Sequence, residues 1–306
     1  MAGGPYDGQI YFDVRPQYPS EWYSMLSALT PRRALAWDVG TGNGQAAVGC
    51  RDRPWQRSFV MEISFVRSHC WVREDTRRFM IKCLWNNIFT LFQIAEHYDS
   101  VIATDISEGQ LEHGIPHPQI RYLHTPDSLS EEELVAMVGG ENSVDLVVVA
   151  TAIHWFDIPK FYSVVNRVLR KPGGLIAIWG YSDIIGVNPE LDALQIRYRE
   201  SAMPYWRPGV KYIFEEYRNL PFPFKSVGLG EEGQPLKLSM KREMNFERFL
   251  DVMRSSSAVG AAKEKGVNLL TEEVVQEFKK AWGAPAPDMV RAVTYNVFMI
   301  AGKLKE

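Results

Sequence analysis

Three glycines follow a short apolar run near the start of the chain and could form a ligand-binding loop. The run, residues 34–39, includes Asp38 and continues into Gly40, Gly42 and Gly44. Glycine permits positive φ and lets a ligand approach the bare backbone closely. Amides at the start of a following helix can meet an anionic group such as a carboxylate. The pattern therefore predicts a binding loop at the end of a buried parallel strand.

A second acid follows another apolar run. Residues 101–107 are predicted to form a strand that contains Asp105 near its end. A carboxylate there can accept both ribose hydroxyls of an adenosine that lies across the strand ends. NAD and S-adenosylmethionine both carry such an adenosine. The dinucleotide pattern G-x-G-x-x-G places its third glycine one residue later than Gly44, so the loop favours S-adenosylmethionine.

The pattern of apolar residues in the rest of the chain predicts the strands and helices that must position these residues. Strands are predicted at 120–123, 144–150, 174–179 and 294–301, and helices at 130–138, 159–169 and 246–253. Strand–helix alternation predicts an α/β fold with a doubly wound, mostly parallel sheet. We expect an N-terminal arm (1–30), a cofactor-binding core (31–181), and a helical C-terminal cap with the final sheet strands (182–306).

The glycine pattern, Asp38-x-Gly40-x-Gly42-x-Gly44, resembles the signature of class I S-adenosylmethionine-dependent methyltransferases. The chain is most similar to the type 11 methyltransferases, in the branch that resembles trans-aconitate methyltransferase. Three further stretches carry this resemblance: YFDVRPQYP at 11–19, ATAIHWF at 150–156 and the turn KPGG at 171–174. The resemblance implies a Rossmann-like fold, S-adenosylmethionine as cofactor and methyl transfer to a small-molecule acceptor, with carboxylates among the expected acceptors.

The resemblance also implies which residues contact the cofactor. Asp105 would take the ribose hydroxyls and Ile106 would pack on the adenine. Many relatives carry an acid-containing turn after the third strand, whereas this chain has His124-Thr125-Pro126-Asp127. The expected cofactor contacts are Asp38, Gly40, Thr41, Gly42, Gly44, Asp105, Ile106, Thr125 and Ala150.

His154 and Trp155 follow the fourth strand, where the transferred methyl is expected. Methyl transfer from a sulfonium needs mainly positioning and desolvation, and a base helps only if the nucleophile arrives protonated. His154 is thus a candidate base or hydrogen-bond donor to the acceptor, and the alternative is a structural histidine beside a packing aromatic. Expected substrate contacts are Tyr11, Arg15, Trp155, Tyr205 and Trp206. Arg15, with Tyr11 and Tyr18, lies on an N-terminal segment that could close over the site, and the alternative is an exposed arm. For Tyr205 and Trp206 the alternative is ordinary core packing.

Residues 50–93 form an anomalous insertion. Gly44 and Asp105 lie about 60 residues apart, although a whole βαβ unit needs about 30. The segment holds all three cysteines (Cys50, Cys70 and Cys83). Its last residues, FTLFQ, are what a translated pyrimidine-rich tract ending in CAG would encode. We interpret it as a retained intron or gene-model error, and the alternative is a genuine lid or partner-binding loop. If translated, it would leave the chain inactive or only able to bind the cofactor.

Composition excludes several other classes. The chain has 306 residues and a formal net charge of −3, which gives no support for binding nucleic acid through phosphate contacts. No secretory signal, membrane span or metal-ligand spacing is seen, so we expect a cytoplasmic monomer or weak dimer without a metal. Two rival functions stay open. An NAD-dependent oxidoreductase is disfavoured because no Tyr-x-x-x-Lys-type pair is found, and the other rival is a non-catalytic binding module.

Overall fold

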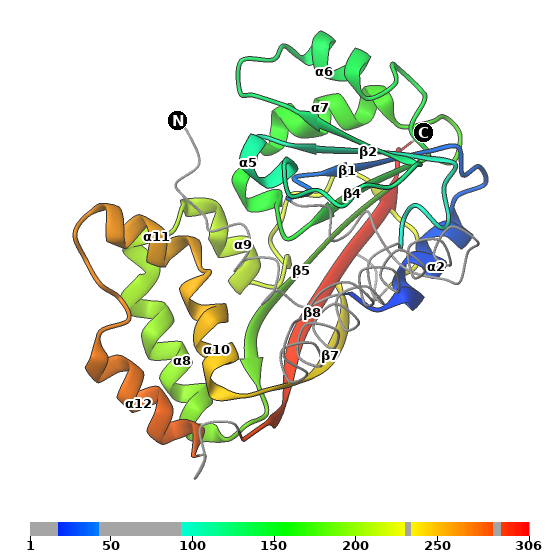
Figure 1. Cartoon of the computed structure of the whole chain (residues 1–306). Helices are drawn as coiled ribbons and strands as arrows, with labels where there is room; N and C mark the ends of the chain where they lie inside the picture. Colours follow the sequence, from blue (N-terminus) through cyan, green and yellow to red (C-terminus); the bar gives the residue numbers. More distant parts are fainter. Residues whose placement is uncertain (1–17, 43–92, 230–233, 284–288, 306) are drawn as a thin grey trace, which may run out of the picture.

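The centre of the molecule is a mixed β-sheet. The computed structural model describes residues 18–42, 93–229, 234–283 and 289–305, and the elements below belong to those ranges. The strand order is β3-β2-β1-β4-β5-β8-β6, and β7 pairs with β8 beside β6 (Figure 1). The strands are β1 (Leu35–Val39), β2 (Ser100–Asp105), β3 (Ile120–His124), β4 (Leu146–Ala150), β5 (Leu175–Ile185), β6 (Lys225–Ser226), β7 (Leu236–Met244) and β8 (Arg291–Lys303).

Strands β1 to β5 are parallel, and β8 runs antiparallel to β5. The chain passes from β1 outward through β2 and β3, then returns to place β4 on the other side of β1. This reversal is the topological switch point of a doubly wound sheet, where ligands bind at the carboxyl ends of the strands. The predicted Rossmann-like, mostly parallel fold is confirmed, including the final strand over 294–301.

Helices cover the sheet and build a separate cap lobe (Figure 1). They begin where the sequence places caps. Ser130 forms a capping box with Glu133 at the start of α6, and Asp157 caps α7, with Pro159 in its first turn. The helices are α2 (Ser20–Leu29), α5 (Glu108–Leu111), α6 (Glu131–Met137), α7 (Ile158–Val168), α8 (Pro189–Ala202), α9 (Lys211–Phe214), α10 (Phe246–Arg254), α11 (Ser257–Glu264) and α12 (Glu272–Trp282).

The hydrophobic core has two parts, one on each face of the sheet. Successive residues of β4 alternate between them, as the two-residue period of a strand requires. Val147 and Val149 pack with the helix α7 on one face, whereas Leu146 and Val148 belong to the cluster that contains the α2 residue Trp22. Every residue of β4 except Ala150 is buried. The continuous apolar run of this strand is therefore explained by burial on both faces.

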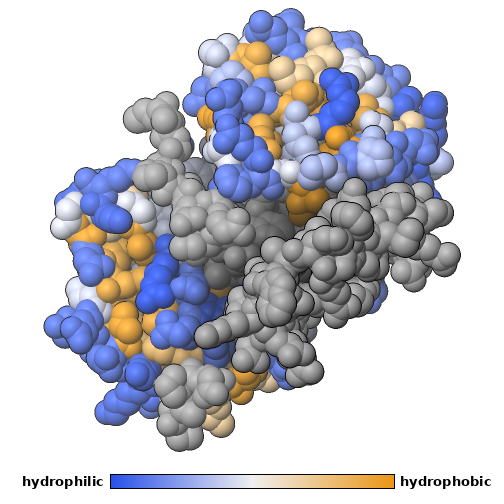
Figure 2. All heavy atoms as spheres, in the orientation of Figure 1, coloured by the Kyte–Doolittle hydropathy of each residue, from blue (hydrophilic) through white to orange (hydrophobic). Residues whose placement is uncertain are grey.

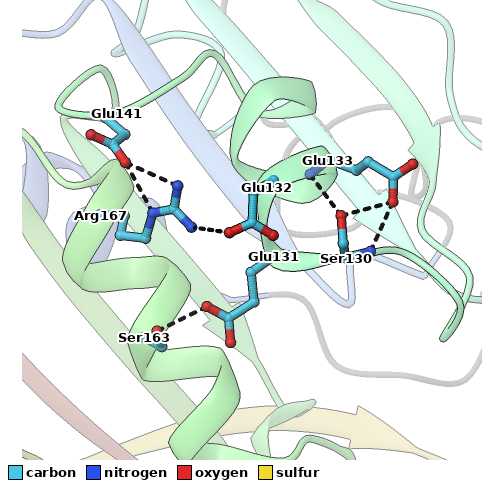
Figure 3. Close-up of polar contacts among 7 residues, drawn as sticks. All are labelled: Ser130, Glu131, Glu132, Glu133, Glu141, Ser163 and Arg167. Carbon is cyan, nitrogen blue, oxygen red and sulfur yellow. Dashed lines mark hydrogen bonds and ion pairs between the residues drawn. The ribbon is translucent and has the colours of Figure 1, made fainter.

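The exposed faces of α6 and α7 are joined by polar contacts. Arg167 on α7 forms ion pairs with Glu132 and Glu141, and Ser163 donates a hydrogen bond to Glu131 (Figure 3). Arg167 is partly exposed and both glutamates of its ion pairs are exposed, so each pair contributes little to stability. Figure 2 shows mainly hydrophilic residues with scattered hydrophobic ones on this upper lobe.

Two long strands connect the sheet to the cap. β5 continues past the expected boundary at residue 181 to Ile185, and β8 pairs with it along this extension. In Figure 1 both strands run from the upper lobe toward the lobe formed by α8, α10, α11 and α12. The expected insertion, 50–93, lies outside the described residues except for Gln93, and α2 forms the end of the expected N-terminal arm. Among the described residues, no helix has both the length and the apolarity to cross a bilayer.

Candidate functional site

The loop after β1 has the backbone geometry that the glycine pattern predicts. Gly40 and Gly42 have φ values of +66° and +60°, in the left-handed region that favours glycine. A Cβ on Gly40 would lie 2.6 Å from Cβ of Ala152, in the loop after β4. The loop after β1 therefore packs directly against the loop after β4, and a side chain at Gly40 would separate them. The third glycine, Gly44, lies outside the described residues.

Asp105, at the end of β2, is bonded to this loop. Its Oδ2 accepts the Gly42 amide at 2.8 Å and its Oδ1 accepts the Ser107 amide at 2.9 Å. Burial raises the pKa of the carboxyl group, and these amide hydrogen bonds oppose that rise. A carboxylate offers about four acceptor positions, so the amides of Gly42, Ser107 and Ile106 do not exhaust them. The acid is thus held at the edge of the cavity with capacity to bind a diol.

Asp38 plays a different part in the same region. Its side chain is 0 % exposed, and its Oδ2 accepts the Thr41 hydroxyl at 2.5 Å. Its Oδ1 has no hydrogen-bond partner among the described residues. Burial raises the pKa of this carboxyl group to about 7. Asp38 does not line the cavity described below, so it supports the loop through Thr41 from underneath.

A cavity of about 790 Å³ lies at the carboxyl ends of β1, β2 and β4 and extends beneath the cap. Its size is within the range typical of small-molecule sites. Ten residues that the sequence predicted as site residues line it: Gly40, Thr41, Gly42, Asp105, Ile106, Thr125, Ala150, His154, Trp155 and Trp206. Tyr205 does not line the cavity, and its ring centroid lies 5.5 Å from Nζ of Lys265. Tyr11 and Arg15 lie outside the described residues.

The loop after β4 is fixed from two sides. Thr151 has a positive φ of 55°, and its hydroxyl is hydrogen-bonded to the Tyr18 hydroxyl at 2.8 Å. On the cap side, a Cβ on Gly209 would lie 2.3 Å from the carbonyl oxygen of His154. Both constraints hold the short 3₁₀ turn Ile153–Trp155 in place. Positive φ at a non-glycine residue is uncommon and is often found at functional sites.

Trp155 lies at the rim of the cavity and carries a cation above its ring. The indole is 40 % exposed, and Cζ of Arg207 lies 5.0 Å from its centroid. Stacking occupies the face of a guanidinium and leaves its edge N–H groups able to bind an anion. No ion pair joins Arg207 to an acid among the described residues. An accessible positive charge therefore stands near His154.

Several cavity residues were missed by the sequence reasoning. Tyr18, which the sequence placed on an N-terminal segment near the site, does line the cavity. The side chains of α8 that face the cavity follow helical spacing, a signal that could have placed them on one face but not in this cavity. The missed residues include Gln110, Lys160, Asp183, Gln195, Tyr198, Arg199 and Arg207. Across the described ranges, no group of three or more His, Cys, Asp or Glu side chains is arranged to hold a metal.

Comparisons with known proteins agree with this architecture. Residues 83–178 match the family model described as a methyltransferase domain. A Dictyostelium discoideum protein assigned as a methyltransferase is 27% identical over 299 residues, covering 96% of this chain and 91% of that protein. A solved structure from Anaeromyxobacter dehalogenans, described as a type II methyltransferase, is 26% identical. It has a TM-score of 0.64, with coverage of 95% of this chain and 99% of that chain.

These similarities support a methyltransferase and show the class I, Rossmann-like fold. The family match covers less than half of the chain, and it begins after the glycine loop. The trans-aconitate branch is not distinguished by these matches and stays a prediction.

Proposed function

We propose that the chain is an S-adenosylmethionine-dependent methyltransferase that acts on a small-molecule acceptor, with a carboxylate as the methylated group. The observation that carries the cofactor assignment is the hydrogen bond between the Asp105 carboxylate and the Gly42 amide. It joins a lone acid to a glycine loop at the switch point of the sheet. A carboxylate in this place can accept the ribose hydroxyls of an adenosine, and the glycine spacing favours S-adenosylmethionine over NAD.

The residues present fit this cofactor. Gly40 and Gly42 provide bare backbone for the methionine part, and Asp105 keeps acceptor capacity for the ribose hydroxyls. Ile106 is 49% exposed although it is apolar, and it lines the cavity next to Asp105. An adenine packed on Ile106 would cover this surface, with Thr125 at its edge. When bound, the cofactor supplies a methyl group already activated on a sulfonium.

The rim of the cavity supports an acidic acceptor. Arg207 is held over Trp155 and lies close to the loop that carries His154. A guanidinium there can form a bidentate pair with a carboxylate. A carboxylate is a nucleophile without losing a proton, so the site needs no general base. His154 is then a hydrogen-bond donor that orients the acceptor.

Isothermal titration calorimetry tests the cofactor assignment. We expect S-adenosylhomocysteine and S-adenosylmethionine to bind, and NAD to show no binding at the same concentrations. Binding of NAD alone would favour the oxidoreductase alternative. A methyl-release assay with small carboxylic acids then tests turnover, and cofactor binding without turnover on any acid would favour a non-catalytic binding module.

A further inference from the structure

The cap end of the cavity carries polar side chains that have no part in the proposed cofactor site or in the loop after β4 that carries His154. Tyr198 and Arg199 come from α8, and Asp183 comes from the extension of β5. Ser256 and Ser257, at the N-terminus of α11, line the same cavity. α11 packs against the turn at 203–205 that directly follows α8, so these groups belong to one wall.

A bulge in β5 turns Asp183 toward the cavity. The register between β5 and β8 shifts between Tyr181 and Ile184, so Ser182 and Asp183 have no partner residue in β8. In a regular strand successive side chains point to opposite faces, yet all four residues from 181 to 184 line the cavity. Bulges re-aim side chains in this way and are over-represented next to active sites.

Arg199 is held in the same wall by two contacts. Its Nη1 donates a hydrogen bond to Oδ2 of Asp183, and its Cζ lies 4.8 Å from the ring centroid of Phe214. A guanidinium has five N–H donors, and stacking uses none of them. Arg199 therefore keeps donors for a ligand after it has paired with Asp183.

Tyr198 has a buried hydroxyl for which the described part of the chain provides no hydrogen-bond partner. Its ring packs edge-on against Phe278, with the centroids 5.7 Å apart, so the side chain is anchored. Buried polar groups are nearly always paired, and an orphan in a native structure calls for an explanation. Burial also raises the pKa of this hydroxyl, which keeps it a neutral donor.

We propose that Tyr198 and Arg199 form a second polar subsite, which binds a hydrogen-bond-accepting oxygen group at the end of the acceptor remote from the methylated atom. The acceptor is therefore a short molecule with two oxygen-bearing ends, one near His154 and one beneath the cap. This inference rests on the proposed function, because it places the methylated end of the acceptor near His154 in the loop after β4.

The test uses the full chain saturated with S-adenosylhomocysteine and measures binding of unbranched dicarboxylic acids from malonate to adipate by calorimetry. The monocarboxylic acid of the same length is the comparison ligand. We expect one dicarboxylate to bind more tightly than its monocarboxylate. Tyr198→Phe should weaken that dicarboxylate about 10- to 100-fold, as expected for one hydrogen bond to a charged carboxylate, and leave the monocarboxylate unchanged.

Thermal stability separates binding from folding. Tyr198→Phe removes an unpaired hydroxyl, so its melting temperature should equal or exceed that of the parent chain. Tyr162→Phe is the matched control, because the Tyr162 hydroxyl donates to the Pro221 carbonyl at 2.8 Å and lies outside the cavity. That variant should melt lower and bind the dicarboxylate normally.

Two results would overturn the subsite: no dicarboxylate binds better than its monocarboxylate, or Tyr198→Phe binds every acid as the parent does. If S-adenosylhomocysteine itself fails to bind, the proposed function fails instead, so the two failures are distinguishable.

Discussion

Oδ2 of Asp105 accepts the amide of Gly42 at 2.8 Å, so the acid that ends β2 fixes the loop that follows β1. The parallel register brings the two strands to the same edge, with Val39 opposite Thr104. A second hydrogen bond, from Thr41 N–H to the Thr104 carbonyl at 2.9 Å, continues the contact. Asp105 thus has two tasks, because it orders the loop and also faces the cavity.

Asp105→Asn should weaken binding of S-adenosylhomocysteine about 10- to 100-fold, because hydrogen bonds to a charged group contribute roughly 1.5–3 kcal/mol. Calorimetry measures the change. Asp99→Asn is the matched control, since Asp99 is exposed and lies just before β2 at its other end. Equal affinities for the Asp105→Asn variant and the parent chain would contradict the ribose assignment.

Asp38→Asn should change how stability depends on pH. The pKa of Asp38 is about 7 in the folded chain, above the ordinary 3.8, so the folded state binds a proton that the unfolded state has lost. This contribution is complete below about pH 4 and is lost as the pH rises through 7. Over that interval the parent should lose about 4 kcal/mol relative to the variant, because each pH unit corresponds to about 1.4 kcal/mol. Urea unfolding at pH 4.5, 6 and 7.5 measures this, and parallel pH curves would refute it.

His154→Gln should lower turnover of a carboxylic acid less than tenfold and leave the shape of the pH–rate profile unchanged. The reason is that a carboxylate acceptor has no proton to remove. Steady-state kinetics with the acid found in the methyl-release screen provide the measurement. A loss of 10²–10⁴-fold together with a lost pH limb would instead identify His154 as a general base.

Gly209→Ala should raise KM for the acceptor while leaving the affinity for S-adenosylhomocysteine within twofold. A methyl group there would meet the His154 backbone, which cannot rotate away as a side chain does. We also expect a loss of about 1–3 kcal/mol in unfolding free energy, as in other overpacked sites. Gly260→Ala is the control, because nothing lies within 4 Å of that position in α11 and alanine favours helix. Unchanged acceptor kinetics in Gly209→Ala would show that the cap contact does not position the loop.

Removal of residues 50–92, which keeps Gln93, should preserve binding of S-adenosylhomocysteine and increase the soluble yield. The chain re-enters the core at Gln93, which is 8% exposed and donates a hydrogen bond to the Tyr18 carbonyl at 3.0 Å. Ile94 and Ala95, which follow it, are 0% and 1% exposed. Calorimetry on the shortened chain tests the prediction, and sequencing of the transcript tests its origin. A mature message that retains the segment would contradict the retained-intron interpretation.

The fold and the part of the cavity at the ends of β1 and β2 could be predicted from sequence because their signals are local. Runs of β-branched residues located the parallel strands, and glycine spacing located the loop at Gly40 and Gly42. The cap side of the cavity depends on contacts between distant segments. Tyr205 and Trp206 are adjacent, yet only Trp206 lines the cavity, since the 3₁₀ turn ends between them. The bulge at Asp183 likewise depends on pairing with β8 and leaves no local signal.

The continuity of β5 and β8 limits how the pocket can open. These strands have 11 and 13 residues, and their paired register runs from the central sheet into the cap with one bulge, at Ser182 and Asp183. A hinge between the two lobes would have to break that ladder of backbone hydrogen bonds. The two lobes should therefore keep a fixed orientation relative to each other. Exchange of the proposed cofactor product should depend on rearrangement of connecting segments and not on rotation of the lobes.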